Sequence, residues 1–238
     1  MQKDPIKDYG IGEELQTLLR KKGLPFFAND NISQVLRPGD LQRIRQEVKL
    51  LMEQLLRTLC IDIENDHNTK NTANRVAKML IDELFSGRYV EEPSSTEFPN
   101  TKLLNQFYVV GPVKINSFCS HHLLPVIGHA WVGILPSENS ALVGLSKIPR
   151  IVEWYARRPQ IQEELVEQIA DHLFDKINPD SLAVTIKADH HCMKIRGIKD
   201  PSSSMTTQSF RGSMREKTEL RAEYNTMLLG HRFGDPTL

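Results

Sequence analysis

The chain has 238 residues, 39% of them hydrophobic, and its 30 basic residues balance its 30 acidic ones. A chain of this length and composition can bury a full core without disulfides. The zero net charge excludes a global attraction for nucleic acid or an anionic membrane surface, so any anion site must be local.

The beginning of the chain is polar and lacks the run of roughly 7 to 15 apolar residues that a secretory signal needs. No stretch reaches the approximately 18 consecutive apolar residues of a membrane span. We therefore expect a soluble, cytoplasmic protein in which Cys60, Cys119 and Cys192 remain thiols.

The first part of the chain has helical periodicity. Apolar residues at helical spacing predict helices over residues 13–22, 40–59 and 72–85. Residues 91–100 are polar, include two prolines and predict a connector. We therefore expect an N-terminal helical region over residues 1–95 and a second domain over residues 96–238, which carries the chemistry.

The second part alternates between strand and helix patterns. Runs rich in Val, Ile and aromatic residues, or alternating with polar ones, predict strands over residues 107–118, 129–135, 182–188 and 205–211. Helical spacing predicts helices over residues 148–155, 161–177 and 217–229. The order strand, strand, helix, helix, strand, strand predicts an α+β domain with an antiparallel sheet and its helices on one face.

Two clusters of histidine and cysteine are the strongest local signal. They are Cys119-Ser120-His121-His122, with His129 nearby, and His190-His191-Cys192. Each lies at the end of a predicted strand. Thiolate and imidazole are natural zinc ligands, and three protein ligands that leave a fourth position to water are typical of a catalytic site. A buried cysteine with a hydrogen-bonded histidine is the commoner alternative.

The spacing of the first cluster restricts which side chains can share an ion. On a regular strand Cys119 and His122 point to opposite faces, so a shared ion requires a turn between them. Pro125 and Gly128 follow shortly after and are compatible with such a departure.

Residues 144–150 combine the start of a helix with positive charge. Ser146 is placed as the N-cap and Pro149 in the first turn. Lys147 and Arg150 face the positive end of the helix dipole, which is unfavourable unless an anion lies between them. The pattern is compatible with a phosphate site, to which Arg196 could add a cation. The alternative is a solvated turn whose cations pair with carboxylates elsewhere.

Five sequence stretches together resemble the GTP cyclohydrolase I family, and the resemblance covers most of the chain, from about Leu41 to the C-terminal helix. They are Cys119-Ser-His-His-Leu, Gly144-Leu-Ser-Lys-Ile-Pro-Arg-Ile-Val, Arg158-Pro-Gln-Ile-Gln-Glu, His190-His-Cys-Met-Lys-Ile-Arg-Gly and Arg75-Val-Ala-Lys-Met. The resemblance implies a tunnelling fold and a homodecamer of two stacked rings with active sites between subunits. It also implies zinc-dependent conversion of GTP to 7,8-dihydroneopterin triphosphate and formate, the first step of pterin (folate or biopterin) or deazaguanine biosynthesis.

The same resemblance assigns roles to individual side chains. The implied zinc ligands are Cys119, His122 and Cys192. The implied catalytic residues are His121, His190 and Ser146, with the two histidines transferring protons. The implied guanine contacts are Gln162 and Glu163, although the helix dipole alone would favour Glu163 at this place. The implied triphosphate contacts are Ser146, Lys147, Arg150 and Arg196, with Arg75 and, as a further candidate, Lys78 from a neighbouring subunit.

Two departures from the family pattern keep alternatives open. Ser120 stands where the family usually has Glu, which could alter metal affinity. The stretch Thr72-Ala-Asn-Arg75 lacks the usual proline of this helix start. The alternatives are a paralogue of the same fold that stops at the formamide intermediate and an inactive scaffold or regulatory subunit.

Overall fold

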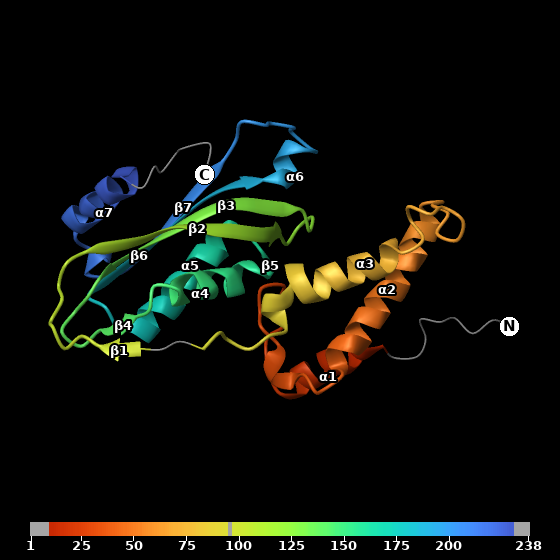
Figure 1. The fold of residues 1–238 in the computed structure, drawn as a ribbon, viewed down its shortest axis with the longest axis horizontal. Coiled ribbons are helices and arrows are strands. Elements are labelled where there is room, and N and C mark those ends of the chain that lie inside the picture. Colours follow the sequence, from red (N-terminus) through yellow and green to blue (C-terminus); the bar gives the residue numbers. More distant parts are fainter. Residues whose placement is uncertain (1–9, 95–96, 231–238) are drawn as a thin grey trace. The chain divides into compact units, whose positions relative to one another are not determined.

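The computed structural model describes residues 10–94 and 97–230 (Figure 1). The chain divides into two compact units, Met1–Glu91 and Glu92–Leu238, and each is described by itself. The polar segment 1–9, on which the expectation of no secretory signal depends, lies outside the described residues. Within the described ranges, no helix combines the length and the apolar character needed to cross a bilayer.

The first unit is helical, and its three predicted helices are confirmed. Helices α1 (Ile11–Lys21), α2 (Asp40–Thr58) and α3 (Thr72–Lys78) are joined by loops with short 3-10 turns, and α3 continues as a π-helical turn over Met79–Leu84. A small core forms where α1 packs against the loop that follows it. Helix α2 contributes little to that core, because only Asp40 and Leu56 are buried along it.

The second unit contains a five-stranded sheet in the order β5-β2-β3-β6-β7. Its strands are β2 (Tyr108–Cys119), β3 (Pro125–Leu135), β5 (Pro159–Gln160), β6 (Ser181–His190) and β7 (Met205–Gly212). The four predicted strands are confirmed, and β6 pairs with β7 in the antiparallel direction. The two-residue β5 was not predicted, and it pairs with the end of β2 in parallel.

Strand β3 begins earlier than residue 129, where its prediction started. Residues 125–128 pair with β2, and residues 126–128 pair with β6 on the other side, so pairing overrides the breaker signal of Pro125 and Gly128. A Cβ atom at Gly128 would lie 2.0 Å from the Lys187 carbonyl oxygen. The glycine therefore permits close approach of β6 and does not end the strand.

A second, two-stranded sheet joins β1 (Glu97–Pro99) to β4 (Ala141–Val143). The segment 91–100, predicted as a connector, thus contains a strand. Its pairing partner lies more than 40 residues away along the sequence, so the local composition could not predict the strand.

Helices cover both faces of the large sheet. Helices α4 (Lys147–Ala156) and α5 (Gln162–Ile177) share a core with one face of β2, β3 and β6, as predicted. Helix α7 (Thr218–Gly230) packs against the opposite face (Figure 1). Its Tyr224 and Leu228 share a core cluster with Trp131 and Ala183. The prediction that all helices lie on one face is wrong for α7, because alternate positions of β3 and β6 are apolar on that face too.

Candidate metal centre and its surroundings

The first histidine and cysteine cluster lies in a tight turn at the end of β2. Residues 120–122 form the turn, the Cys119 N–H donates to the Leu124 carbonyl at 2.9 Å, and the Leu123 N–H donates to the Cys119 carbonyl at 2.8 Å. Leu123 has a φ of +53°, in the left-handed region. This is the turn that a shared ion requires, and it places His122 Nδ1 3.9 Å from Cys119 Sγ.

The second cluster approaches from the end of β6. The strand ends at His190, and the short helix α6 (His191–Lys194) then carries Cys192. The ligand atoms of Cys119, His122 and Cys192 all lie within 4.8 Å of one another. Two sulfurs and one imidazole nitrogen at this separation fit a soft or borderline metal ion such as Zn²⁺, and three protein donors leave room for water or substrate.

Cys119, His122 and Cys192, here called the trio, include two thiols whose negative charges, once both are ionised, would repel each other. Burial raises the pKa of the Cys192 thiol, and negative charge on the nearby Cys119 raises it further. Two thiolates are therefore unfavourable together without a cation. A bound metal ion would supply that charge and hold both groups deprotonated.

Arg196 contacts the same trio through the histidine. Its Nη1 lies 2.6 Å from His122 Nε2, and because arginine can only donate, Nε2 accepts. The neutral His122 ring then carries its hydrogen on Nδ1, the nitrogen that faces Cys119.

The two histidines expected to transfer protons lie within two residues of a candidate metal ligand in the sequence. His121 Nδ1 lies 3.7 Å from Cys119 Sγ, and its side chain is exposed. His190 Nε2 lies 2.9 Å from Gln162 Oε1. Burial lowers the pKa of His190, and the negative charge of Glu163 partly opposes this effect.

Ser146, Lys147 and Arg150 lie at the start of α4, where the sequence predicts a phosphate site. Ser146 occupies the N-cap position, yet its hydroxyl makes no capping bond. Lys147 Nζ donates to the Ser94 carbonyl at 3.2 Å, and Arg150 is exposed. Among residues 10–94 and 97–230, neither cation pairs with a carboxylate, so the structure offers no support for the ion-paired surface turn.

The two residues expected to contact the base differ sharply in exposure. Glu163 is exposed, whereas Gln162 is only 1% exposed and its amide is bonded within the protein. Arg75 and Lys78 are exposed on α3 of the first unit, which is described by itself. Sequence reasoning missed the contact between Gln162 and His190, because the two residues are 28 positions apart and no local pattern relates them.

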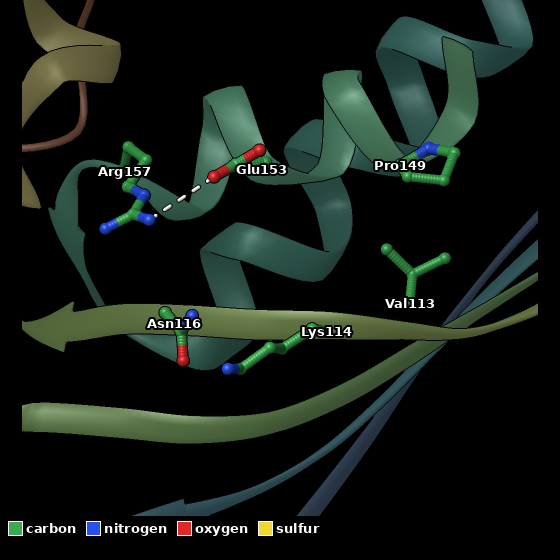
Figure 2. Close-up of a pocket in the computed structure, with 6 residues that line it drawn as sticks. All are labelled: Val113, Lys114, Asn116, Pro149, Glu153 and Arg157. Atoms are coloured by element: carbon green, nitrogen blue, oxygen red, sulfur yellow. Dashed lines mark hydrogen bonds and ion pairs between the residues drawn. The ribbon is translucent and has the colours of Figure 1, made fainter. Parts of the chain in front are cut away.

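A cavity of about 100 Å³ lies elsewhere, between β2 and α4 (Figure 2). It is lined by Val113, Lys114, Asn116, Pro149, Glu153 and Arg157. Arg157 donates to Glu153 at 3.3 Å across one side of it. None of the residues assigned a role from the sequence lines this cavity.

Comparison with known proteins gives one consistent family. A model described as GTP cyclohydrolase I matches residues 48–229. A GTP cyclohydrolase 1 of Aliivibrio salmonicida is 35% identical over 220 residues, covering 92% of this chain and 93% of the relative. Those of Flavobacterium johnsoniae and Dehalococcoides mccartyi are each 38% identical, covering 79% and 77% of this chain and 83% and 96% of the relatives.

Among solved structures, the apo form of the archaeosine synthase QueF-Like covers 52% of this chain and 98% of its own. The sequence identity is 15% and the TM-score 0.35, too low to carry an argument.

Proposed function

This chain belongs to the GTP cyclohydrolase I family and is an enzyme of the hydrolase class, and from this premise we propose that it converts GTP to 7,8-dihydroneopterin triphosphate and formate. One observation carries the proposal: two thiols and an imidazole from segments about 70 residues apart have their ligand atoms within 4.8 Å of one another. Such a donor set is suited to a hydrolytic metal ion.

In this proposal Cys119, His122 and Cys192 hold Zn²⁺. When bound, Zn²⁺ supplies a Lewis acid and lowers the pKa of its water ligand, so that hydrolysis proceeds near neutral pH. The raised pKa of Cys192 in the metal-free protein means that metal uptake releases protons and weakens as the pH falls.

The two other histidines would move protons during the reaction. Imidazole changes its protonation state near neutral pH, which suits both donation and acceptance. His121, exposed beside Cys119, would protonate the purine nitrogen that leaves when the five-membered ring opens. His190 would protonate the ribose ring oxygen, and the lowered pKa of its ring favours rapid return to the neutral form.

The start of α4 would bind the triphosphate. The Ser146 hydroxyl has no capping bond to give up, and Lys147 and Arg150 have no carboxylate partner among the described residues. Arg196 would add a cation from the neighbouring cluster, and Arg75 and Lys78 from a second subunit. Because the triphosphate does not react, its binding energy can hold the base in place through several steps.

Glu163 would recognise the guanine base. Its carboxylate is exposed one residue beyond Gln162, and a carboxylate can accept from two neighbouring N–H groups on the base edge.

We extend the proposal to the domains, the pathway and the assembly. Residues 96–238 form a tunnelling-fold catalytic domain, and residues 1–95 form an N-terminal helical region. The chain assembles into a homodecamer and acts in pterin or deazaguanine biosynthesis. Support for assembly comes from α2, where Leu51 and Leu55 are each 49% exposed. Further support comes from β2: within the part of the chain that the structure describes, its outer side is paired only at Phe118 and Cys119, which leaves most of that edge without a partner strand.

The test is to incubate zinc-loaded protein with GTP, oxidise the mixture and measure neopterin fluorescence, with Cys192→Ala as the control. We expect fluorescence only from the unsubstituted chain. A formylated pyrimidine product without fluorescence would favour the truncated reaction, and no product at all would favour the inactive scaffold.

The phosphate site has a separate test. The double variant Lys147→Ala, Arg150→Ala should weaken GTP binding by about tenfold or more while the bound zinc is retained, because two charge-assisted contacts are lost. Calorimetry and metal analysis measure the two quantities. Unchanged GTP affinity would remove α4 from the proposal.

A further inference from the structure

Gln162 is a polar side chain in an unusually enclosed position. It is the first residue of α5 and only 1% exposed. Its Nε2 donates to the Ile186 carbonyl at 3.1 Å, the Met205 carbonyl at 3.2 Å and Thr207 Oγ1 at 3.1 Å. The amide nitrogen therefore joins α5 to both β6 and β7.

These contacts determine which way the amide points. The carbonyl oxygens of Ile186 and Met205 can only accept, so the side of the amide that faces them must be the NH₂ group. Oε1 must then point to the other side, where His190 Nε2 lies at 2.9 Å. An amide oxygen can only accept, and His190 Nε2 must therefore carry a hydrogen.

We infer that Gln162 is a positioning residue that fixes the neutral His190 ring in the tautomer with its hydrogen on Nε2, so that Nδ1 is the nitrogen of the neutral ring that carries no hydrogen. The inference depends on the proposed function only for the reaction in which His190 acts. It replaces the expected role of Gln162 as a guanine contact.

The hydrogen bonds that Gln162 already makes inside the protein disfavour a direct contact between its side chain and substrate. Both amide hydrogens and one lone pair of Gln162 are already used inside the protein. A substrate donor could reach only the second lone pair of Oε1, and the whole side chain is just 1% exposed. The exposed Glu163 can reach solvent without any such restriction.

Nuclear magnetic resonance on metal-free, ¹⁵N-histidine-labelled protein tests the inference directly. The two ring nitrogens of His190, assigned by comparison with His190→Gln, should show hydrogen on Nε2 and none on Nδ1 in the neutral ring. Hydrogen on Nδ1 in the unsubstituted chain would overturn the inference, and this outcome needs no folded variant at position 162.

Two variants separate positioning from structural support. Gln162→Met keeps the length of the side chain but removes the acceptor, so both tautomers of His190 should become populated. Thr207→Val removes one partner of Nε2 and leaves Oε1 in place. It should lower stability without changing the tautomer.

Kinetics and binding separate positioning from substrate contact. In Gln162→Met, kcat should fall by about 10- to 100-fold, within the contribution of general acid–base catalysis, while the Kd of GTP for the metal-free protein changes by less than about twofold. An unchanged tautomer, or a Kd raised about tenfold with kcat preserved, would refute positioning. If the unsubstituted enzyme fails to turn over GTP, the proposed function fails, but the tautomer measurement still decides the role of Gln162.

Discussion

Helices α5 and α2 carry the same kind of apolar periodicity but are buried to very different degrees. Helix α5 buries seven of its 16 residues, whereas α2 buries two of its 19. On α2, Leu50, Leu51 and Leu55 are about half exposed, while Leu173 of α5 is completely buried. Periodicity therefore predicts a helix and its apolar face, but not whether the same chain covers that face.

Polar contacts of α5 extend the difference. Glu167 and Asp171 both accept from Arg211 of β7, at 2.5 and 2.6 Å, and these two bonds raise the pKa of the arginine. With Gln162, the helix is thus joined to the sheet at its start and its middle.

The largest effect expected along this comparison is on the buried face of α5. Leu173→Ala should lower the free energy of unfolding by about 2–5 kcal/mol, because it removes packed methyl groups and leaves a cavity. Urea unfolding followed by circular dichroism measures the change. A loss below about 1 kcal/mol would mean that the core under α5 can collapse around the gap.

A smaller effect, dependent on pH, is expected at His172 on the same helix. Its Nδ1 lies 3.1 Å from the Tyr155 hydroxyl and its Nε2 3.4 Å from a Glu92 carboxylate oxygen. Burial is the main cause that lowers the pKa of His172 below its usual 6.5, and Glu92 opposes the shift.

The sign of the pH effect follows from proton uptake. As the pH falls below about 6.5, the unfolded chain takes up a proton at this histidine before the folded chain does. The free energy of unfolding should therefore fall as the pH is lowered through this range, and should not change with this group above about pH 6.5. His172→Gln should flatten this dependence in urea titrations between pH 5 and 8. His67→Gln, at a side chain 91% exposed in the helical unit, is the matched control and should leave it unchanged.

The smallest effect on single-chain stability is expected on α2. Leu51→Ala combined with Leu55→Ala should change the free energy of unfolding by no more than about 1 kcal/mol in dilute protein, since both side chains are half exposed. Assembly should nonetheless be lost if a second copy covers this face. Sedimentation velocity measures the oligomeric state. An unaltered oligomer would show that the leucines of α2 do not form the contact between copies.

The sequence predicted those features that depend on local pattern. Helical and strand periods identified the elements, and the need for a turn between Cys119 and His122 followed from strand geometry alone. Features set by distant partners were missed: the pairing of β1 with β4, the position of α7 and the early start of β3. The role of Gln162 could not be predicted for the same reason, because no spacing relates it to His190.

The turn after β2 also has a consequence for how an ion is captured. Both backbone groups of Cys119 are bonded across the turn, and the Ser120 N–H donates to the Gln160 carbonyl of β5 at 3.3 Å. The conformational entropy lost in ordering these residues therefore belongs to the folding of the sheet, before any ion arrives. An incoming ion would therefore meet a Cys119 whose backbone is already ordered, and less entropy would be lost on binding than at a turn that forms only around the ion.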